Sequence, residues 1–414
     1  MTIKKIGQKA KEAKFVLATA KTADKDAALI KIADFLVRDI DYIISENKKD
    51  IDAAKENGTT KALIDRLMLN EKRVHDMAEG ARDIAKSSDP VGRVLSGNTL
   101  KNGLRLQKVA APLGVIAVIY EARPNVTADA AALCIKSGNA VILRGGKEAI
   151  NSNKAIVKVM REAVQLVGLP ADIIGFIEDT SRESATELMR LNEYVDVLIP
   201  RGGAGLIKSC VENATIPVIE TGTGNCHIYV DENADTDMAV DIIVNAKTTR
   251  VSVCNSCESL VIHENMLKDT LPVIADALKN KGVELRCDEK SLLVLPDEKK
   301  ATEEDFHTEY LDYIVSVKTV SNIDEAISHI NKYGTGHSDA IITNSLENAN
   351  KFTSAVDSAA VYVNTSTRFT DGGEFGFGAE IGISTQKLHA RGPLGLNDLT
   401  SAKYVVYGDG QIRE

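Results

Sequence analysis

Tryptophan is absent from this chain of 414 residues, and aromatic residues make up only 4% of it. Proteins that bind single-stranded nucleic acid usually stack the bases on aromatic side chains. The formal net charge of −9 also disfavours general binding to nucleic acid or to an anionic lipid surface. The composition therefore argues against a nucleic-acid-binding module, and we expect no nucleic-acid partner.

The sequence also has no apolar run that approaches the roughly 20 residues of a membrane-spanning helix. Residues 1–8 lack the apolar core of a secretory signal. We therefore expect a cytoplasmic protein without a membrane partner. In that compartment the six cysteines are expected to be reduced thiols.

Helical and strand-like patterns alternate along most of the chain. Residues 8–90 read as helices, because apolar residues such as Leu29, Ile32 and Leu36 recur at three- and four-residue steps. Short, continuously apolar runs separated by helical patterns then predict a parallel sheet covered on both faces. The predicted strands are 115–120, 140–143, 173–177, 195–199 and 216–219.

The alternation restarts after residue 225, which predicts a second α/β domain. Its predicted strands are 260–262, 284–285, 291–295, 314–317, 340–342 and 360–363, and its predicted helices are 266–279 and 324–331. Asn102-Gly103 between two short alternating runs predicts a hairpin. Residues 402–407 predict a last strand with no evident partner, and the Gly-rich residues 367–378 predict a loop.

Cys254 is the first candidate for chemistry. It stands in Val253-Cys254-Asn255-Ser256-Cys257, and a thiolate there would form an acyl-enzyme that splits one difficult step into two. Arg250 could lower the pKa of such a thiol. An inert buried thiol is the alternative. The spacing of Cys254 and Cys257 also suits a metal or redox pair, but no second ligand pair exists, so we predict no metal.

Glu220 ends an apolar run before Thr221-Gly222, so its carboxylate could act as a general base at a strand end. A cap or a solvated charge is the simpler interpretation of this residue alone. Ile199-Pro200-Arg201-Gly202-Gly203 follows a strand and opens a helix, a pattern that suits a phosphate. A tight turn is the alternative there.

Arg144-Gly145-Gly146-Lys147 again follows a strand, and its two cations could meet the 2′-phosphate that separates NADP from NAD. Arg123, Arg368 and His389 are candidates for an anionic substrate, since an arginine fork binds carboxylate and phosphate through two hydrogen bonds. Each of these residues taken singly is also compatible with a solvated surface position.

Taken together, these segments resemble the aldehyde dehydrogenase superfamily. The segments that carry the resemblance, in the family's order, are 113–115, 137–141, 168–170, 219–222 and Cys254. Within it, residues 119–126, 199–203, 220–227, 361–373 and 378–393 are most similar to the γ-glutamyl phosphate reductase family. The similarity covers nearly the whole chain, and its last two segments are long and specific.

The resemblance implies an aldehyde dehydrogenase-like α/β fold with two parallel-sheet domains and a small β oligomerisation element. It places an NADP-binding domain at residues 1–97 and 112–222 and a catalytic domain at 223–395. Residues 98–111 and 396–414 would form the oligomerisation hairpin and the C-terminal strand. A homo-oligomer is therefore expected, because an edge strand can extend a neighbouring subunit's sheet.

The implied reaction is the NADPH-dependent reduction of γ-glutamyl 5-phosphate, a step of proline biosynthesis, through a thioester on a cysteine. The resemblance assigns catalysis to Cys254, Asn255 and Glu220. It assigns cofactor binding to Arg144, Gly145, Lys147, Arg201, Gly202, Gly203 and Glu309, and substrate binding to Arg123, Ser366, Thr367, Arg368 and His389. A contact with glutamate kinase, the source of the acyl phosphate, is a further partner that the resemblance allows.

Two features depart from the hydrolytic members of the superfamily. Where those members carry an asparagine that donates to the oxyanion, this chain reads Glu121-Ala122-Arg123-Pro124. A phosphate reductase also has no need of a glutamate that activates water. A hydrolytic NAD(P)-dependent aldehyde dehydrogenase remains the alternative activity, and a cofactor-binding protein without catalysis is the alternative from another class.

Overall fold

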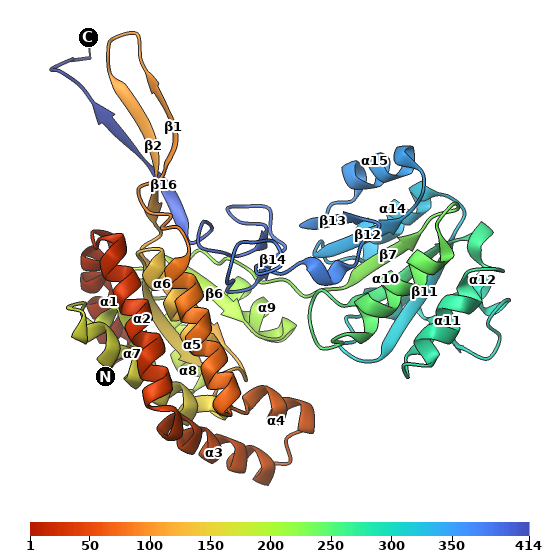
Figure 1. The fold of residues 1–414 in the computed structure, drawn as a ribbon, viewed down its shortest axis with the longest axis horizontal. Coiled ribbons are helices and arrows are strands. Elements are labelled where there is room, and N and C mark those ends of the chain that lie inside the picture. The colour runs from red at the N-terminus through yellow and green to blue at the C-terminus, as the bar shows by residue number, and fades with distance from the viewer. Residues whose placement is uncertain (414) are drawn as a thin grey trace. The chain divides into compact units, whose positions relative to one another are not determined.

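The computed structural model describes residues 1–413; Glu414, the last residue of the predicted C-terminal segment, lies outside the described residues. Two compact units make up the chain (Figure 1). Unit 1 contains Met1–Thr221, Gly376–Gly382 and Leu394–Glu414, and unit 2 contains Gly222–Phe375 and Ile383–Pro393. No helix among the described residues is both long and apolar enough to span a bilayer.

Unit 1 is built around a four-stranded parallel sheet in the order β5-β4-β3-β6. In β3, Val115, Ala117 and Ile119 pack in one cluster with α1 and α8, so alternate residues serve the two faces of the sheet. The strands are β3 (Val115–Tyr120), β4 (Ala140–Gly145), β5 (Ile174–Phe176) and β6 (Val197–Arg201). The predicted strand at 216–219 is reduced to a single bridge between Leu198 and Val218.

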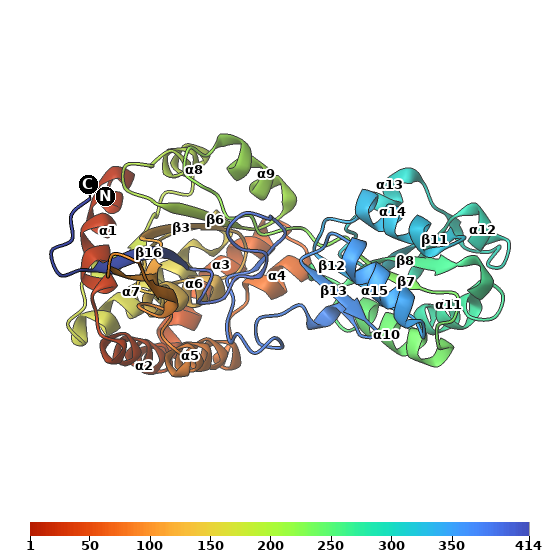
Figure 2. The ribbon, with the colours of Figure 1, turned by 90° about the horizontal axis from the view of Figure 1, so that it is seen from above.

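Nine α-helices accompany this sheet in the described part of unit 1. The pair α2 and α5 lie alongside each other (Figure 2), and the stripe of Leu29, Ile32 and Leu36 on α2 is fully buried. The helices are α1 (Ile3–Ala18), α2 (Thr22–Arg38), α3 (Ile40–Glu56), α4 (Lys61–Leu67), α5 (Glu71–Lys86), α6 (Asn125–Lys136), α7 (Ile150–Leu166), α8 (Arg182–Met189) and α9 (Ala204–Asn213).

The predicted hairpin and the last predicted strand meet in one antiparallel sheet of unit 1. β1 (Val94–Thr99) pairs with β2 (Arg105–Pro112), and β16 (Thr400–Tyr407) pairs with the other side of β2. The strand for which the sequence offers no partner therefore finds one about 300 residues earlier in the same chain, and the three strands form an arm that extends from the helices of this unit (Figure 1).

Unit 2 holds a seven-stranded parallel sheet in the order β10-β9-β11-β8-β7-β12-β13. Helices α10 and α11 cover one face and α14 and α15 the other (Figure 1). The strands are β7 (Cys226–Val230), β8 (Cys257–His263), β9 (Glu284–Cys287), β10 (Lys299–Lys300), β11 (Ile314–Val320), β12 (Ser338–Ile342) and β13 (Ala360–Val363), and a separate pair is β14 (Ile383–Ser384) with β15 (Gly392–Pro393).

The helices of unit 2 include one where a strand was predicted, and others that were not predicted. They are α10 (Thr236–Thr248), α11 (Leu271–Lys279), α12 (Glu289–Leu292), α13 (Glu303–His307), α14 (Ile323–Tyr333) and α15 (Leu346–Ala355). The strand predicted at 291–295 is wrong, because the Asp288 side chain accepts from the N–H of Ser291 and starts a short helix there. The pattern also failed to predict β7 and α10.

Candidate active site

Cys254 lies on the loop that joins the end of α10 to the start of β8 in unit 2. All six cysteines are among the described residues; Cys254 is partly exposed, and the other five are buried. A thiol must reach solvent or a ligand to act as a nucleophile, so this position fits the expected role.

The peptide of Cys254 is held by two residues that lie about thirty positions upstream. The Cys226 thiol donates to the Cys254 carbonyl oxygen, with 3.1 Å between Sγ and O. Gly224 passes so close that a Cβ on it would lie 1.5 Å from the same oxygen. Only a glycine fits at this close approach of two backbones.

Asn255, the next residue, ties the loop to the segment that contains Arg368. Its Nδ2 donates to the carbonyls of Arg368 (3.2 Å) and Thr370 (3.0 Å), and Arg368 Nη1 donates to its Oδ1. Thr367 Oγ1 donates to the Asn255 carbonyl at 2.8 Å. Both amide hydrogens of Asn255 thus go to backbone carbonyls, which favours a structural task over the catalytic role that the resemblance implies.

Arg368 and Cys254 interact electrostatically. Burial lowers the pKa of the Arg368 guanidinium, as does the neighbouring Arg250, whereas the negative charge of Cys254 raises it. The Nε atom of Arg368 is buried and has no hydrogen-bond partner among the described residues. The opposite charge of Arg368 therefore favours the thiolate form of Cys254.

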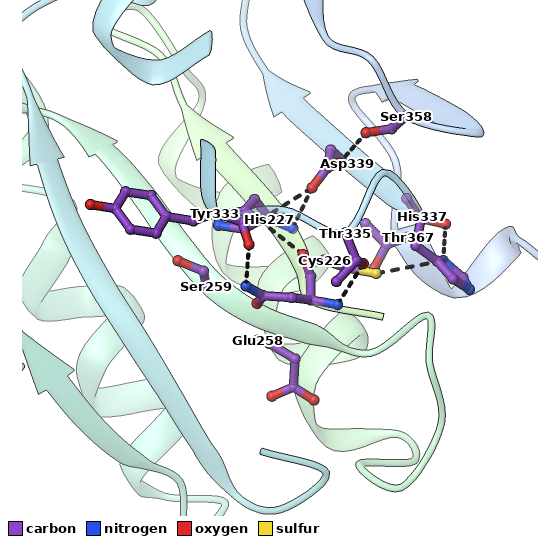
Figure 3. A network of polar contacts seen from close by, with 12 residues as sticks. Cys226, His227, Glu258, Ser259, Tyr333, Thr335, His337, Asp339, Ser358 and Thr367 are labelled. Carbon is purple, nitrogen blue, oxygen red and sulfur yellow. Dashed lines mark hydrogen bonds and ion pairs between the residues drawn. The ribbon is translucent and has the colours of Figure 1, made fainter. Parts of the chain in front are cut away.

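A buried polar network supports this side of the loop. Figure 3 shows the His337 ring turned toward the sulfur of Cys226, with 3.7 Å between Nδ1 and Sγ. His337 Nδ1 also lies 2.7 Å from Ser338 Oγ, which in turn lies 2.6 Å from Thr370 Oγ1. The chain of contacts connects the start of β12 with the segment that binds Asn255. Burial lowers the pKa of His337 to about 4, so its ring stays neutral at ordinary pH.

Glu309, which we expected on the cofactor side, lies in unit 2 and accepts a hydrogen bond from the Gly224 N–H at 2.7 Å. Burial raises the pKa of its carboxyl group in spite of that bond. The glycine that passes the Cys254 carbonyl is thus fixed on its other side by Glu309.

The remaining expected cofactor residues lie in unit 1, at the carboxyl ends of its parallel strands. Arg201 ends β6, and Gly202 and Gly203 precede α9. The Gly203 N–H donates to Glu121 Oε2 at 3.0 Å, and Arg201 Nε is buried without a partner among the described residues. The unpaired Nε of Arg201, beside a helix amino end, suits an anion.

Arg144 and Gly145 end β4, and the exposed Lys147 follows them. The Nη2 of Arg144 donates to the carbonyls of Thr180 (2.8 Å) and Ser181 (2.7 Å), while its Nε has no partner among the described residues. Half of the Arg144 fork is therefore committed to the protein's own backbone, which leaves Lys147 as the more available cation at this edge.

The last four expected residues are spread over both units. Glu220 of unit 1 is partly exposed between Ile219, whose N–H donates to Leu198, and Thr221, whose hydroxyl donates to Pro200. Arg123 is partly exposed before α6. Ser366 caps the turn of Arg368, and His389 stands in an exposed turn between β14 and β15.

The sequence reasoning missed several residues around Cys254. The sequence marks Cys226 only as one of six expected thiols, although in the structure its thiol contacts the peptide of Cys254. Thr370 and Glu121 were not singled out either. No local pattern marks these residues, because their partners lie far away in the chain. The separation is 28 positions for Cys226, 115 for Thr370 and 82 for Glu121.

Comparisons with known proteins agree with this architecture. The family model for the aldehyde dehydrogenase family matches residues 1–293 and 294–405.

Similarity to curated proteins is more specific. The chain is 60% identical to a γ-glutamyl phosphate reductase of Clostridium botulinum (strain Eklund 17B / Type B) over 407 residues, 98% of each chain. It is 59% identical to the reductase of Carboxydothermus hydrogenoformans, over 99% of this chain and 98% of the relative. The crystal structure of the γ-glutamyl phosphate reductase from Thermotoga maritima superposes with a TM-score of 0.97 at 50% identity and covers 99% of both chains.

The chain therefore belongs to the aldehyde dehydrogenase family and, within it, to the γ-glutamyl phosphate reductases. It is an oxidoreductase.

Proposed function

We propose that this protein reduces γ-glutamyl 5-phosphate to glutamate 5-semialdehyde and phosphate, with NADPH as the reductant and Cys254 as the nucleophile. The observation that carries the proposal is the similarity of 60% over nearly the full length to γ-glutamyl phosphate reductases. The partly exposed thiol and its electrostatic interaction with the partly buried Arg368 support the assignment of Cys254. The reaction belongs to proline biosynthesis.

The chemistry at Cys254 begins with its thiolate, which the adjacent Arg368 favours. The sulfur forms a bond with the acyl carbon, the bond between that carbon and the phosphate oxygen breaks, and phosphate leaves with the electron pair. A thioester on Cys254 remains. When the aldehyde departs, the electron pair of the carbon–sulfur bond returns to the sulfur.

Stabilisation of the oxyanion falls to backbone N–H groups of the 254–256 loop, since both Asn255 amide hydrogens are committed to carbonyls. Asn255 then acts as a positioning residue for the loop. Arg368, Ser366, Thr367, Arg123 and His389 are proposed to hold the phosphate and the α-carboxylate of the substrate. The bidentate fork of Arg368 suits either anion.

The cofactor is proposed to bind at the carboxyl edge of the unit 1 sheet. The buried, unpaired Nε atoms of Arg144 and Arg201 and the glycines that open α9 fit an anionic dinucleotide. Lys147 would bind a 2′-phosphate. Glu309 is also proposed to contact the cofactor, as a hydrogen-bond acceptor. When bound, the nicotinamide supplies the hydride that reduces the thioester. Glu220 is proposed to help deprotonate the Cys254 thiol, since no hydrolytic water is needed.

The arm of β1, β2 and β16 is proposed to join subunits into a homo-oligomer, with unit 1 otherwise serving the cofactor and unit 2 serving catalysis. Support comes from the exposed apolar side chains of Tyr404, Val406 and Tyr407 on β16, an edge strand. A contact with glutamate kinase is an open addition to this proposal, because the acyl phosphate is short-lived.

The proposal is tested by trapping the enzyme during turnover and digesting it for mass spectrometry. A glutamyl adduct on Cys254 is expected, and an adduct on another residue, or none, contradicts the mechanism. Oxidation of the semialdehyde with and without phosphate separates this activity from a hydrolytic dehydrogenase, which needs no phosphate. Titration with NADPH and NADH, followed by nicotinamide fluorescence in wild type and Lys147→Glu, tests the cofactor assignment.

A further inference from the structure

A fully buried ion pair joins the two ends of the loop that carries Cys254. Lys247 is in the last turn of α10, and Glu258 is the second residue of β8. Their side chains have no solvent exposure, and 2.6 Å separates Lys247 Nζ from Glu258 Oε2. Together with the hydrogen bond from Ser256 Oγ to the Ala246 carbonyl (3.2 Å), this pair closes the base of the eight-residue loop between α10 and β8.

The same pair is connected to the segment that fixes Gly224. Glu258 Oε1 accepts a hydrogen bond from the Leu311 N–H at 3.4 Å, and Leu311 lies two residues after Glu309. Leu311 has a φ of +53°, a strained conformation for a non-glycine residue. A backbone held in such a conformation requires strong support from its surroundings. The pair therefore connects the base of the Cys254 loop to the segment 309–311.

Stability alone is a poor reason for a charged pair at this position. Burial raises the pKa of Glu258 to about 7 even beside Lys247, which means that the charged carboxylate is costly here. Well-packed apolar residues of similar volume are often as stable as a buried ion pair, or more so. Unlike apolar packing, the ion pair fixes the distance and the direction between Lys247 and Glu258.

We propose that Lys247 and Glu258 are positioning residues for the nucleophile, and that their contact sets the geometry in which Cys254 faces Arg368 and the acyl carbon. The proposal rests on the proposed function only in so far as Cys254 is the reacting thiol. Neither residue touches the substrate. They act by holding the backbone of the loop in place. A displacement of about 1 Å at a reacting atom can lower the rate about a hundredfold, so a small shift of the loop is enough to slow turnover.

The experiment replaces both charges together, in Lys247→Met with Glu258→Met. Because neither charge is left unpaired, the melting temperature is expected to stay at or above that of the wild type. The turnover number is expected to fall by about tenfold to about a hundredfold with little change in KM. The pH midpoint of Cys254 alkylation by iodoacetamide is expected to move to higher pH, because the thiol no longer faces Arg368 in the same way.

A matched control is the Lys25–Asp89 pair of unit 1, which is also buried and has 2.5 Å between Nζ and Oδ2. Lys25→Met with Asp89→Met is expected to leave the midpoint of Cys254 alkylation unchanged. If the double variant at 247 and 258 does not fold, Glu258→Gln serves instead, since it keeps the shape and can still accept from Lys247, but it loses the charge and one of the two acceptor oxygens. It is expected to move the alkylation midpoint in the same direction by a smaller amount.

A folded variant with wild-type turnover and a wild-type alkylation midpoint would overturn the proposal and leave the pair with a purely space-filling role. Lower turnover that follows only from a lower melting temperature would overturn it as well. Failure of the proposed function has a different signature, because a wild-type enzyme without a glutamyl adduct on Cys254 still allows the alkylation midpoints to be compared.

Discussion

The thiol of the fully buried Cys226 donates to the backbone carbonyl of Cys254 across 3.1 Å, so one cysteine holds the peptide of another. Cys226 starts β7 and Cys257 starts β8, and the two are paired in register in the parallel sheet. The loop that carries Cys254 thus enters β8 next to a strand that begins with Cys226.

Cys226→Val is expected to slow turnover, because the Cys254 carbonyl then loses its donor while the volume at the site is kept. A neutral hydrogen bond contributes about 1 kcal/mol, which corresponds to about a fivefold loss in kcat if the whole effect reaches the loop. Steady-state kinetics measure this directly. Cys226→Ser, which keeps a donor, is the control, and equal losses in both variants would show that the bond is irrelevant.

Gly224→Ala is expected to disrupt the loop far more strongly. The added Cβ would lie 1.5 Å from the Cys254 carbonyl oxygen and 2.3 Å from its carbon, and both are backbone atoms that a rotamer change cannot move. We expect a loss of turnover of about a hundredfold or more, since a displacement of about 1 Å suffices for that.

Gly80→Ala is the matched control, because Gly80 lies inside α5 and its nearest neighbour would be 4.0 Å away. Alanine there is expected to raise stability by about 0.5 to 1 kcal/mol without slowing turnover. Activity of Gly224→Ala close to that of Gly80→Ala would mean that the two backbones do not approach each other in solution as the structure has them.

Asp129 makes stability depend on pH. Burial raises the pKa of its carboxyl group from 3.8 to about 6, against the opposing effects of Asn125 and Arg201. A raised carboxyl pKa stabilises the folded state below about pH 4, and this contribution is lost as the pH rises through 6. Asp129→Asn, which keeps an acceptor for Asn125, is therefore expected to be more stable than the wild type by about 3 kcal/mol at pH 8 and nearly equal to it at pH 4.

Urea unfolding of both proteins at several pH values measures that difference. Asp76→Asn, at an exposed position of the same unit, is the control for the loss of a carboxylate charge. A constant difference between wild type and Asp129→Asn from pH 4 to 8 would contradict a desolvated carboxylate at residue 129.

Local patterns of the sequence predict the sheets of this protein well where apolar runs are continuous. The strands at 115–120 and 140–145 are buried on both faces, and their sequences show it. The error at 291–295 has a different origin. Leu292, Leu293 and Leu295 look like a strand run, but the short helix α12 ends at Leu292. A strand would place Leu293 and Leu295 on one face, whereas Leu293 is 84% exposed and Leu295 is buried.

The candidate site is predictable only in part. The residues Cys254 and Arg368 stand out by type and by similarity to known families, but their proximity depends on contacts between positions 113 residues apart. The commitment of the Asn255 amide to backbone carbonyls, and of Arg144 to Thr180 and Ser181, depends on side-chain directions that no spacing rule encodes.

The exposed edge of β16 is expected to control the oligomeric state. Tyr404→Glu with Val406→Glu would place charges on two exposed apolar positions of that strand, 64% and 51% exposed in the single chain. Charged edge strands resist pairing with another chain, so a smaller species is expected. Sedimentation velocity measures it, and Lys403→Glu, a charged position on the same strand, is the control. An unchanged sedimentation coefficient in the double variant would remove β16 from the interface.

Two arginines compete for the role of the cation that favours the Cys254 thiolate. Arg250 precedes Cys254 by four positions and is exposed, whereas Arg368 is partly buried and interacts with the thiol. Water screens an exposed charge far more than a partly buried one. Arg368→Gln is therefore expected to move the midpoint of Cys254 alkylation to higher pH by about one unit, and Arg250→Gln by much less.

Arg368→Lys separates charge from geometry, because lysine keeps the cation but not the planar fork that binds Asn255 and an anionic substrate. We expect this variant to keep most of the alkylation shift but to raise the KM for the acyl phosphate. If Arg250→Gln moved the midpoint as far as Arg368→Gln does, the local sequence around the cysteine, and not the distant segment at 366–370, would govern the reactivity of the thiol.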